Sequence, residues 1–178
     1  HILTEQIEKG RSELEYIDSV LDTVSRAESE RELAQIREEL TEQGYLRKQK
    51  GKQRPQAALP PLEFTSSDGF KILVGRNNTQ NDKLTLKIAN KNDMWLHTKD
   101  IHGSHTVVFA EGREISDTAI LEAAQLAAYY SKARESSQVP VDYTLVRYVS
   151  KPSGARPGMV IYVNNKTVYV TPKANISE

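Results

Sequence analysis

The stretch DMWLHTKDIHGSHTVV, residues 93–108, gathers the side chains of this chain that are best suited to chemistry. It contains the single tryptophan, Trp95, and three of the four histidines, His97, His102 and His105. Imidazole nitrogens bind transition metals, transfer protons at neutral pH and contact nucleic acids. The cluster therefore suggests a metal site, a catalytic site or a nucleic-acid contact, beside the plain alternative of an ordinary strand–turn–strand unit.

The spacing gives weak support to the metal and catalytic alternatives. The histidines do not follow the H-E-x-x-H pattern of a zinc site, and the absence of cysteine removes cysteine-based zinc sites. Ser104 directly precedes His105, and neighbouring residues on a strand point to opposite faces, which disfavours a nucleophile–base pair. We therefore expect no bound metal, no cofactor and no catalytic residue.

A nucleic-acid contact fits this stretch better. Alternation along a strand places Trp95 and His97 on one face, where both rings can stack on a base or lie against a ribose. Gly103 permits close backbone approach, and Ser104 and His105 offer contacts to phosphate or 2′-hydroxyl groups. A lone tryptophan in an apolar strand is more often a core residue, so that alternative stays open. The residues predicted to join this site, from loops without acidic residues, are Arg76, Asn77, Gln80, Asn81, Lys151 and Arg156.

The surrounding sequence predicts an α+β fold, with a mostly antiparallel sheet packed on one main helix. The main helix is expected at 116–135, where Ser116 caps it, and a further helix is expected at 83–90 after a polar loop at 76–82. Hairpins are expected around the turn of Ser67, Asp68 and Gly69 and across Asn164 and Asn165. The segments that have the composition and alternation of strands are 62–67, 70–75, 94–98, 104–110, 141–150, 159–163 and 166–171.

The N-terminal residues predict two amphipathic helices that form either a hairpin packed on itself or the end of a longer coiled coil. The second helix is expected to begin at a capping box of Ser25 and Glu28 and to stop at Gly44. The clean heptad spacing, broken only at Gly10, favours the coiled coil and predicts self-association through these helices or folding of the first helix back onto the chain. The heptad positions are Leu3, Ile7, Leu14, Ile17, Leu21 and Val24.

Charge suggests three parts along the chain. The 24 basic and 24 acidic residues cancel overall, but the first 42 residues are strongly acidic, and residues 44–55 are basic without any acid. We predict a coiled-coil helical arm at 1–44, a basic proline-containing linker at 45–61 and a domain at 62–178. The chain has no apolar run long enough to span a membrane. Since it starts as if inside a helix, we expect a piece of a longer protein.

In combination, these motifs resemble the NFACT-R domain. The pattern is D-x-W-x-H followed by G-S-H, with GRNNTQND upstream and KPSGARPG downstream. The resemblance runs from about Ser66 to Pro172, and the upstream helices resemble the end of the family's central coiled coil. The family includes bacterial RqcH-type ribosome quality-control factors and FbpA-like fibronectin-binding proteins.

The resemblance implies a non-catalytic RNA-binding module of a cytoplasmic ribosome quality-control factor. Full-length members of this kind bind obstructed large ribosomal subunits and recruit alanyl-tRNA for C-terminal alanine tailing, so the expected contacts are tRNA or rRNA. The alternative is a cell-surface adhesin fragment that binds host fibronectin. A metal-dependent nuclease is the third hypothesis.

Overall fold

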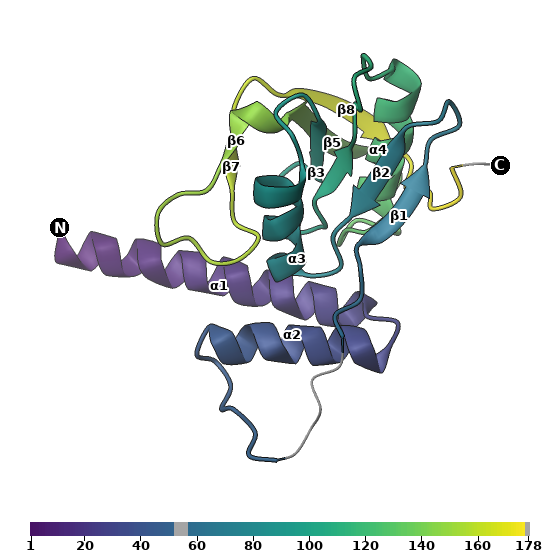
Figure 1. Ribbon diagram of the computed structural model, residues 1–178. Helices are drawn as coiled ribbons and strands as arrows, with labels where there is room; N and C mark the ends of the chain where they lie inside the picture. The colour runs from purple at the N-terminus through teal and green to yellow at the C-terminus, as the bar shows by residue number, and fades with distance from the viewer. Residues whose placement is uncertain (52–56, 177–178) are drawn as a thin grey trace.

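A six-stranded sheet forms the centre of the structure (Figure 1). The structure is a computed structural model, and it describes residues 1–51 and 57–176. The strand order of the sheet is β1-β2-β4-β3-β5-β8, and each of these pairings is antiparallel. The fold class expected from the sequence is thereby confirmed. The strands are β1 (Leu62–Thr65), β2 (Lys71–Val74), β3 (Met94–Thr98), β4 (Thr106–Val108), β5 (Val139–Leu145) and β8 (Lys166–Val170).

One predicted hairpin is correct and the other is wrong. β1 and β2 pair across a turn at Gly69, whose φ of 93° favours glycine. The strands on either side of Asn164 do not pair with each other. Instead, β7 (Ile161–Tyr162) joins β6 (Val149–Ser150) in a separate two-stranded sheet, and β8 pairs with β5. Burial decides this arrangement, because Val170 on β8 lies in the main core.

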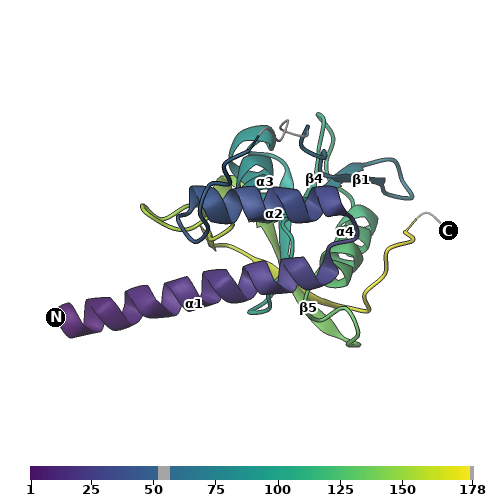
Figure 2. The same ribbon diagram turned by 90° about the horizontal axis from the view of Figure 1, so that it is seen from below.

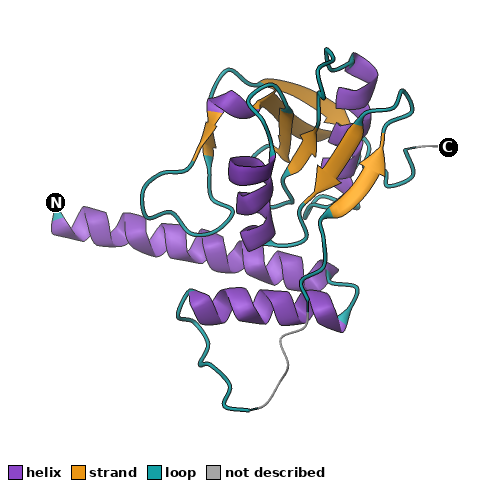
Figure 3. Cartoon of the chain, viewed as in Figure 1, coloured by secondary structure: helices purple, strands orange, loops and turns teal. Residues whose placement is uncertain are grey.

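The helix α4 (Asp117–Tyr129) packs on one face of the sheet (Figure 3). Its cap is the predicted one, since the Ser116 hydroxyl accepts a 3.0 Å hydrogen bond from the backbone N–H of Ala119. Small side chains on the buried stripe let the helix backbone lie close to the sheet. These fully buried alanines are Ala119, Ala123, Ala124, Ala127 and Ala128.

The opposite face is covered by a short helix, α3 (Asn78–Lys83), which continues into the π-helical turn η1 (Leu84–Ile88). The expected helix at 83–90 is therefore present, but the expected polar loop before it is largely helical as well. Asn77 caps α3 by accepting a 2.8 Å hydrogen bond from the backbone N–H of Gln80. A second core cluster beneath these turns consists of Leu73, Leu84, Trp95, Val107 and Phe109. The 3-10 turn η2 (Val146–Tyr148) follows β5.

The N-terminal arm is a hairpin of α1 (Ile2–Arg26) and α2 (Glu30–Glu42), seen side by side from below in Figure 2. The N-terminal half of α1 extends beyond the rest of the molecule (Figures 1 and 2). The buried face consists of Tyr16, Val20 and Ile36, and Met159 of the domain packs against them. The arm is therefore a hairpin, which was one of the two alternatives. The face of α1 that is buried in it is not the face that carries most of the heptad stripe. Most of that stripe is 41–70% exposed, namely Leu3, Ile7, Leu14, Leu21 and Val24.

The predicted start of the second helix is displaced by four residues. The chain remains helical through Arg26, so Ser25 lies within α1 and its hydroxyl donates to the carbonyl of Asp22. Ser29 is the cap of α2, and it accepts a 3.2 Å hydrogen bond from the backbone N–H of Glu32. In residues 1–51 and 57–176, no helix has the length and apolar character needed to cross a membrane.

Candidate nucleic-acid interface

The residues of the D-x-W-x-H and G-S-H motifs form a cluster of rings between β3, β4 and β7. The rings of Trp95 and His97 are stacked, with centroids 5.7 Å apart and planes 4° apart. His105 meets the Trp95 ring edge-on at 5.3 Å, and Tyr162 lies against it at 4.7 Å. Trp95 is only 1% exposed, so a base cannot stack on it unless its neighbours move. The alternative of a core tryptophan therefore describes its position.

His105 is held as a neutral imidazole. Its Nδ1 lies 2.7 Å from the hydroxyl of Thr85, and its Nε2 lies 3.0 Å from the carbonyl oxygen of Gly158. The carbonyl can only accept, so Nε2 carries the proton and Nδ1 accepts from the hydroxyl. Burial lowers the pKa of His105 to about 3, and the neighbouring His97 contributes in the same direction. This side chain therefore joins η1, β4 and the loop at Gly158.

His97 is half-buried, and both of its ring nitrogens face carbonyl oxygens. Nδ1 lies 2.7 Å from the oxygen of Thr98, and Nε2 lies 3.2 Å from that of Gly103. A neutral ring donates from only one nitrogen at a time. Burial lowers the pKa of His97, although both carbonyls act in the opposite direction. Across the described ranges, no group of three or more His, Cys, Asp or Glu side chains is placed to hold a metal ion.

The asparagines at the start of α3 lie beside the G-S-H motif, as their composition suggested, but their side chains face inward. The Oδ1 of Asn81 accepts a 3.2 Å hydrogen bond from the backbone N–H of His105. The Nδ2 of Asn78 donates to the hydroxyl of Ser19 on the arm at 3.0 Å. Gln80 likewise bonds main-chain groups, at Leu59 and Arg76. The side chains of Asn77, Asn78 and Asn81 are buried, and so is Ser104 of the G-S-H motif.

The three predicted basic residues have acidic partners, contrary to the expectation from their local sequence. Arg76 pairs with Glu32 on α2 at 2.5 Å, and Lys151 pairs with Asp82 on α3 at 2.9 Å. Arg156 lies 3.4 Å from Glu13 on α1 and also over the ring of Tyr45. Each partner is distant in sequence, so a loop that lacks acids in sequence is not free of them in space. The acidic arm supplies two of the three.

A cleft of about 770 Å³ separates α1 from the ring cluster and the loop at 152–162. Five predicted residues line it, namely Trp95, His97, Gly103, His105 and Arg156. Tyr162, Ser153 and Ser12 line it as well, and they were not predicted from the sequence. The other six predicted residues lie outside its lining, and they are Arg76, Asn77, Gln80, Asn81, Ser104 and Lys151.

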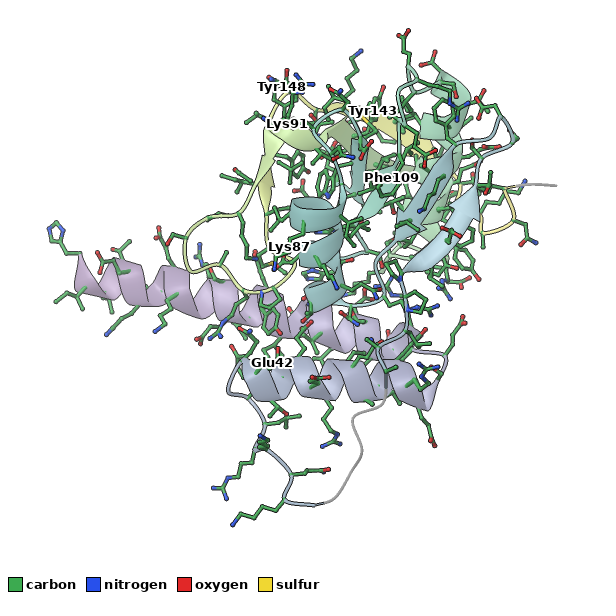
Figure 4. All side chains as sticks on the ribbon, viewed as in Figure 1. Glu42, Lys87, Lys91, Phe109, Tyr143 and Tyr148 are labelled. Atoms are coloured by element: carbon green, nitrogen blue, oxygen red, sulfur yellow. The ribbon has the colours of Figure 1, made fainter. Side chains whose placement is uncertain are left out.

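Another surface, which we call the basic face, was missed in the sequence. It consists of Lys83, Lys87, Lys91 and Arg147, all exposed and none in an ion pair with a described residue. Lys87 and Lys91 project from the α3–η1 segment and the turn that follows it (Figure 4). The sequence contained an indication of this surface, because residues 83–92 and 143–151 contain no aspartate or glutamate.

Comparison with known protein families decides the relationship. Residues 61–164 match the family described as NFACT protein RNA binding domain, and residues 1–58 match NFACT N-terminal and middle domains. The chain belongs to the NFACT family. The resemblance stated from the sequence is thereby confirmed, and NFACT-R is the part that contains the cleft lining from Trp95 to Tyr162.

Within the NFACT family, the chain is homologous to proteins named Rqc2 homolog RqcH. It is 49% identical over 177 residues to the one from Bacillus subtilis strain 168 and 45% identical over 171 residues to the one from Streptococcus suis. These alignments cover 98% and 96% of this chain but only 30% of each relative. A solved structure of the C-terminal part of the fibronectin/fibrinogen-binding protein from Streptococcus suis is 42% identical, with a TM-score of 0.91. That match covers 98% of this chain and 69% of the other.

Proposed function

We propose that this chain is the RNA-binding part of a ribosome quality-control factor. The observation that carries the proposal is the match of residues 61–164 to the NFACT RNA binding domain in a chain homologous to RqcH. In the full-length protein, this part would contact tRNA or rRNA while the protein binds obstructed large ribosomal subunits. Recruitment of alanyl-tRNA for C-terminal alanine tailing would need the remaining domains, because the chain spans about 30% of the length of these relatives.

Within this function, we infer that the cleft receives a single unstacked nucleotide. Its volume of about 770 Å³ lies in the usual range for ligand sites, and His97 and Tyr162 supply rings in its lining. The indole N–H of Trp95 has no hydrogen-bond partner among the described residues, but it is buried, so a base would reach it only after the neighbouring rings moved. Arg156 stands at the arm side of the cleft, where a phosphate would compete with Glu13 for its guanidinium.

The predicted residues outside the cleft lining then have supporting roles in this proposal. Asn81 fixes the backbone at His105, and Asn77 caps α3. Arg76 and Gln80 hold α3 against the segment that leads into β1, through the carbonyls of Pro60 and Leu59. The backbone N–H of Ser104 donates to the carbonyl of Tyr130. The remaining member, Lys151, anchors the loop at 152–158 to Asp82.

Filling the cleft tests this site. Ser153 and Ser12 are exposed residues on opposite walls, so Ser153→Trp and Ser12→Trp should block it and leave the fold intact. Binding of a single-stranded oligoribonucleotide should weaken about tenfold, since a stacked base contributes roughly 1–3 kcal/mol. Ser137→Trp, an exposed serine outside the cleft lining, is the matched control. Equal binding by blocked and control variants would contradict the cleft assignment.

A second candidate function is binding of host fibronectin at the cell surface. Its support is the similarity to the solved Streptococcus suis protein, whose name states fibronectin and fibrinogen binding. Salt separates the two candidates, because RNA affinity carried by phosphate contacts falls steeply as salt rises. We expect this chain to bind RNA with such a dependence and more tightly than it binds purified fibronectin. Tighter, salt-insensitive binding of fibronectin would reverse the order.

We also propose that the chain is not an enzyme and acts in the cytoplasm. His105 is 2% exposed, and the ring nitrogens of both His105 and His97 already face hydrogen-bond partners within the protein. The metal-dependent nuclease hypothesis is tested by incubating the chain with RNA and divalent cations. Intact RNA is the expected result, whereas cleavage that a chelator abolishes would establish nuclease activity.

A further inference from the structure

We propose that the basic face of Lys83, Lys87, Lys91 and Arg147 binds the sugar–phosphate backbone of RNA. The inference rests on the proposed RNA-binding function and names the surface that supplies most of its affinity. It concerns a different part of the domain from the cleft, whose lining includes none of these four residues. The cleft would accept one nucleotide, while the basic face would hold the flanking strand.

The lysines stand on a rigid support. Leu84 anchors η1 in the second core cluster, where it is fully buried. The hydroxyl of Thr85 is bonded to the imidazole of His105 at 2.7 Å. π-Helical turns occur often at functional sites, and this one combines buried anchors with exposed side chains. Lys83, Lys87 and Lys91 follow at intervals of four residues along α3, η1 and the next turn.

Arg147 fixes a second segment beside the lysines. Its Nη2 donates to Oδ1 of Asn92, and its Nε donates to the carbonyl oxygen of Lys91 at 3.4 Å. Arginine has five N–H donors, so this anchoring leaves donors on Nη1 for a phosphate oxygen. The neighbouring Tyr148 is 36% exposed, which places an aromatic ring at the same surface (Figure 4). Basic side chains interleaved with an exposed ring are typical of surfaces that follow a single strand.

Charge distinguishes this face from the three basic residues that the sequence predicted for the site. Arg76, Lys151 and Arg156 are each neutralised by an acid within 3.4 Å. The basic face has no such partner among the described residues, and its two segments contain no acid in sequence. Asp93 lies two residues after Lys91 in the sequence, but it is only 2% exposed. Its carboxylate accepts hydrogen bonds from the backbone N–H groups of Asn90 and Ala110. A polyanion therefore finds uncompensated positive charge here.

The test compares two lysine pairs in the complete chain. Lys87→Ala with Lys91→Ala removes two charges from the basic face, and Lys132→Ala with Lys173→Ala removes two from exposed positions elsewhere. Affinity for a mixed-sequence single-stranded oligoribonucleotide is measured at several salt concentrations. Affinity decreases as salt rises, so the slope of log affinity against log salt is negative. Its magnitude should decrease by about 0.7 for each phosphate that the protein no longer neutralises, and so by about 1.4 for the first pair. The control pair should leave the slope unchanged.

Each other outcome has a defined meaning. Equal slopes for both pairs, with RNA still bound, would overturn the basic face and leave the RNA-binding function standing. No RNA binding by the unmodified chain would overturn both. Polyglutamate serves as a probe for an acidic protein partner. If it bound the basic face as tightly as RNA of similar length, the face would belong to such a protein instead.

Discussion

The carboxylate of Glu39 on α2 accepts a 2.6 Å hydrogen bond from the hydroxyl of Tyr16 on α1. The same carboxylate accepts from the backbone N–H and the hydroxyl of Thr79, at 2.7 and 2.8 Å. Glu39 is only 3% exposed. One buried side chain therefore joins both helices of the arm to the domain. It holds α1 in the position where α1 forms one wall of the cleft.

Removal of this carboxylate should loosen the arm. Glu39→Ala leaves the buried Tyr16 hydroxyl and the Thr79 N–H without an acceptor, so we expect the free energy of unfolding to fall by about 2–4 kcal/mol. Urea denaturation measures the change, and limited proteolysis of α1 reports on release of the arm. Glu38→Ala, one position earlier and exposed, is the matched control. Equal stability of the two variants would show that the Glu39 network does not hold the arm.

His105 should make the protein less stable in mild acid. Its pKa is about 3 in the folded protein against an ordinary value of 6.5, so the unfolded chain binds the extra proton between these values. The contribution of His105 to the free energy of unfolding is therefore fully present above about pH 6.5. It declines as the pH falls, by up to about 1.4 kcal/mol per pH unit. His105→Gln should remove this contribution. Urea denaturation between pH 5 and pH 7 measures it, and an unchanged pH slope in the variant would refute the assignment.

Two glycine substitutions should act in opposite directions. A Cβ on Gly75 would lie 1.8 Å from Oδ1 of Asn81, the atom that receives the His105 N–H. We expect Gly75→Ala to lower the free energy of unfolding by about 1–3 kcal/mol or more. Gly10 lies within α1 and has open space around it, so Gly10→Ala should raise helix stability by about 1 kcal/mol. Thermal denaturation followed by circular dichroism compares them, and a loss of stability at Gly10 would contradict this view of α1.

The exposed heptad stripe of α1 still predicts self-association through the N-terminal helices. Leu14 and Leu21 are 66% and 60% exposed, and burial of each side chain contributes roughly 1.5–3 kcal/mol. Leu14→Lys with Leu21→Lys should therefore yield a monomer at concentrations where the unmodified chain associates. Sedimentation velocity over a range of concentrations measures this. A monomeric unmodified chain at the highest concentration would refute the prediction.

Local patterns in the sequence predicted those features that depend on neighbouring residues. Alternation identified β3, the cap at Ser116 identified α4, and the turn that contains Gly69 identified the first hairpin. The hairpin expected at Asn164 is absent, because the partner of β8 is chosen by burial of Val170 against a distant strand. A turn signal specifies that the chain reverses, and it does not specify which strands pair.

The site was predicted less completely than the fold, for a related reason. Arg156 and its partner Glu13 are far apart in the sequence, so inspection of the loop alone suggested a free cation. Trp95 and His97 share a face as predicted, but Tyr162 packs over the same tryptophan from a strand whose position depends on the whole sheet. The basic face was overlooked because its lysines lie in a segment whose apolar spacing fits both a strand and a helix. Only the folded chain brings Arg147 beside Lys91.

Crosslinking tests most directly the central claim that this chain binds RNA. The chain is irradiated with a tRNA transcript and, separately, with a mixed-sequence single strand, and the crosslinked peptides are mapped by mass spectrometry. We expect crosslinks in residues 83–92 and 143–162, which contain the basic face and one wall of the cleft. An absence of crosslinks to both RNAs would contradict RNA binding, and crosslinks confined to α4 and β1 would contradict the basic face and the cleft as its sites.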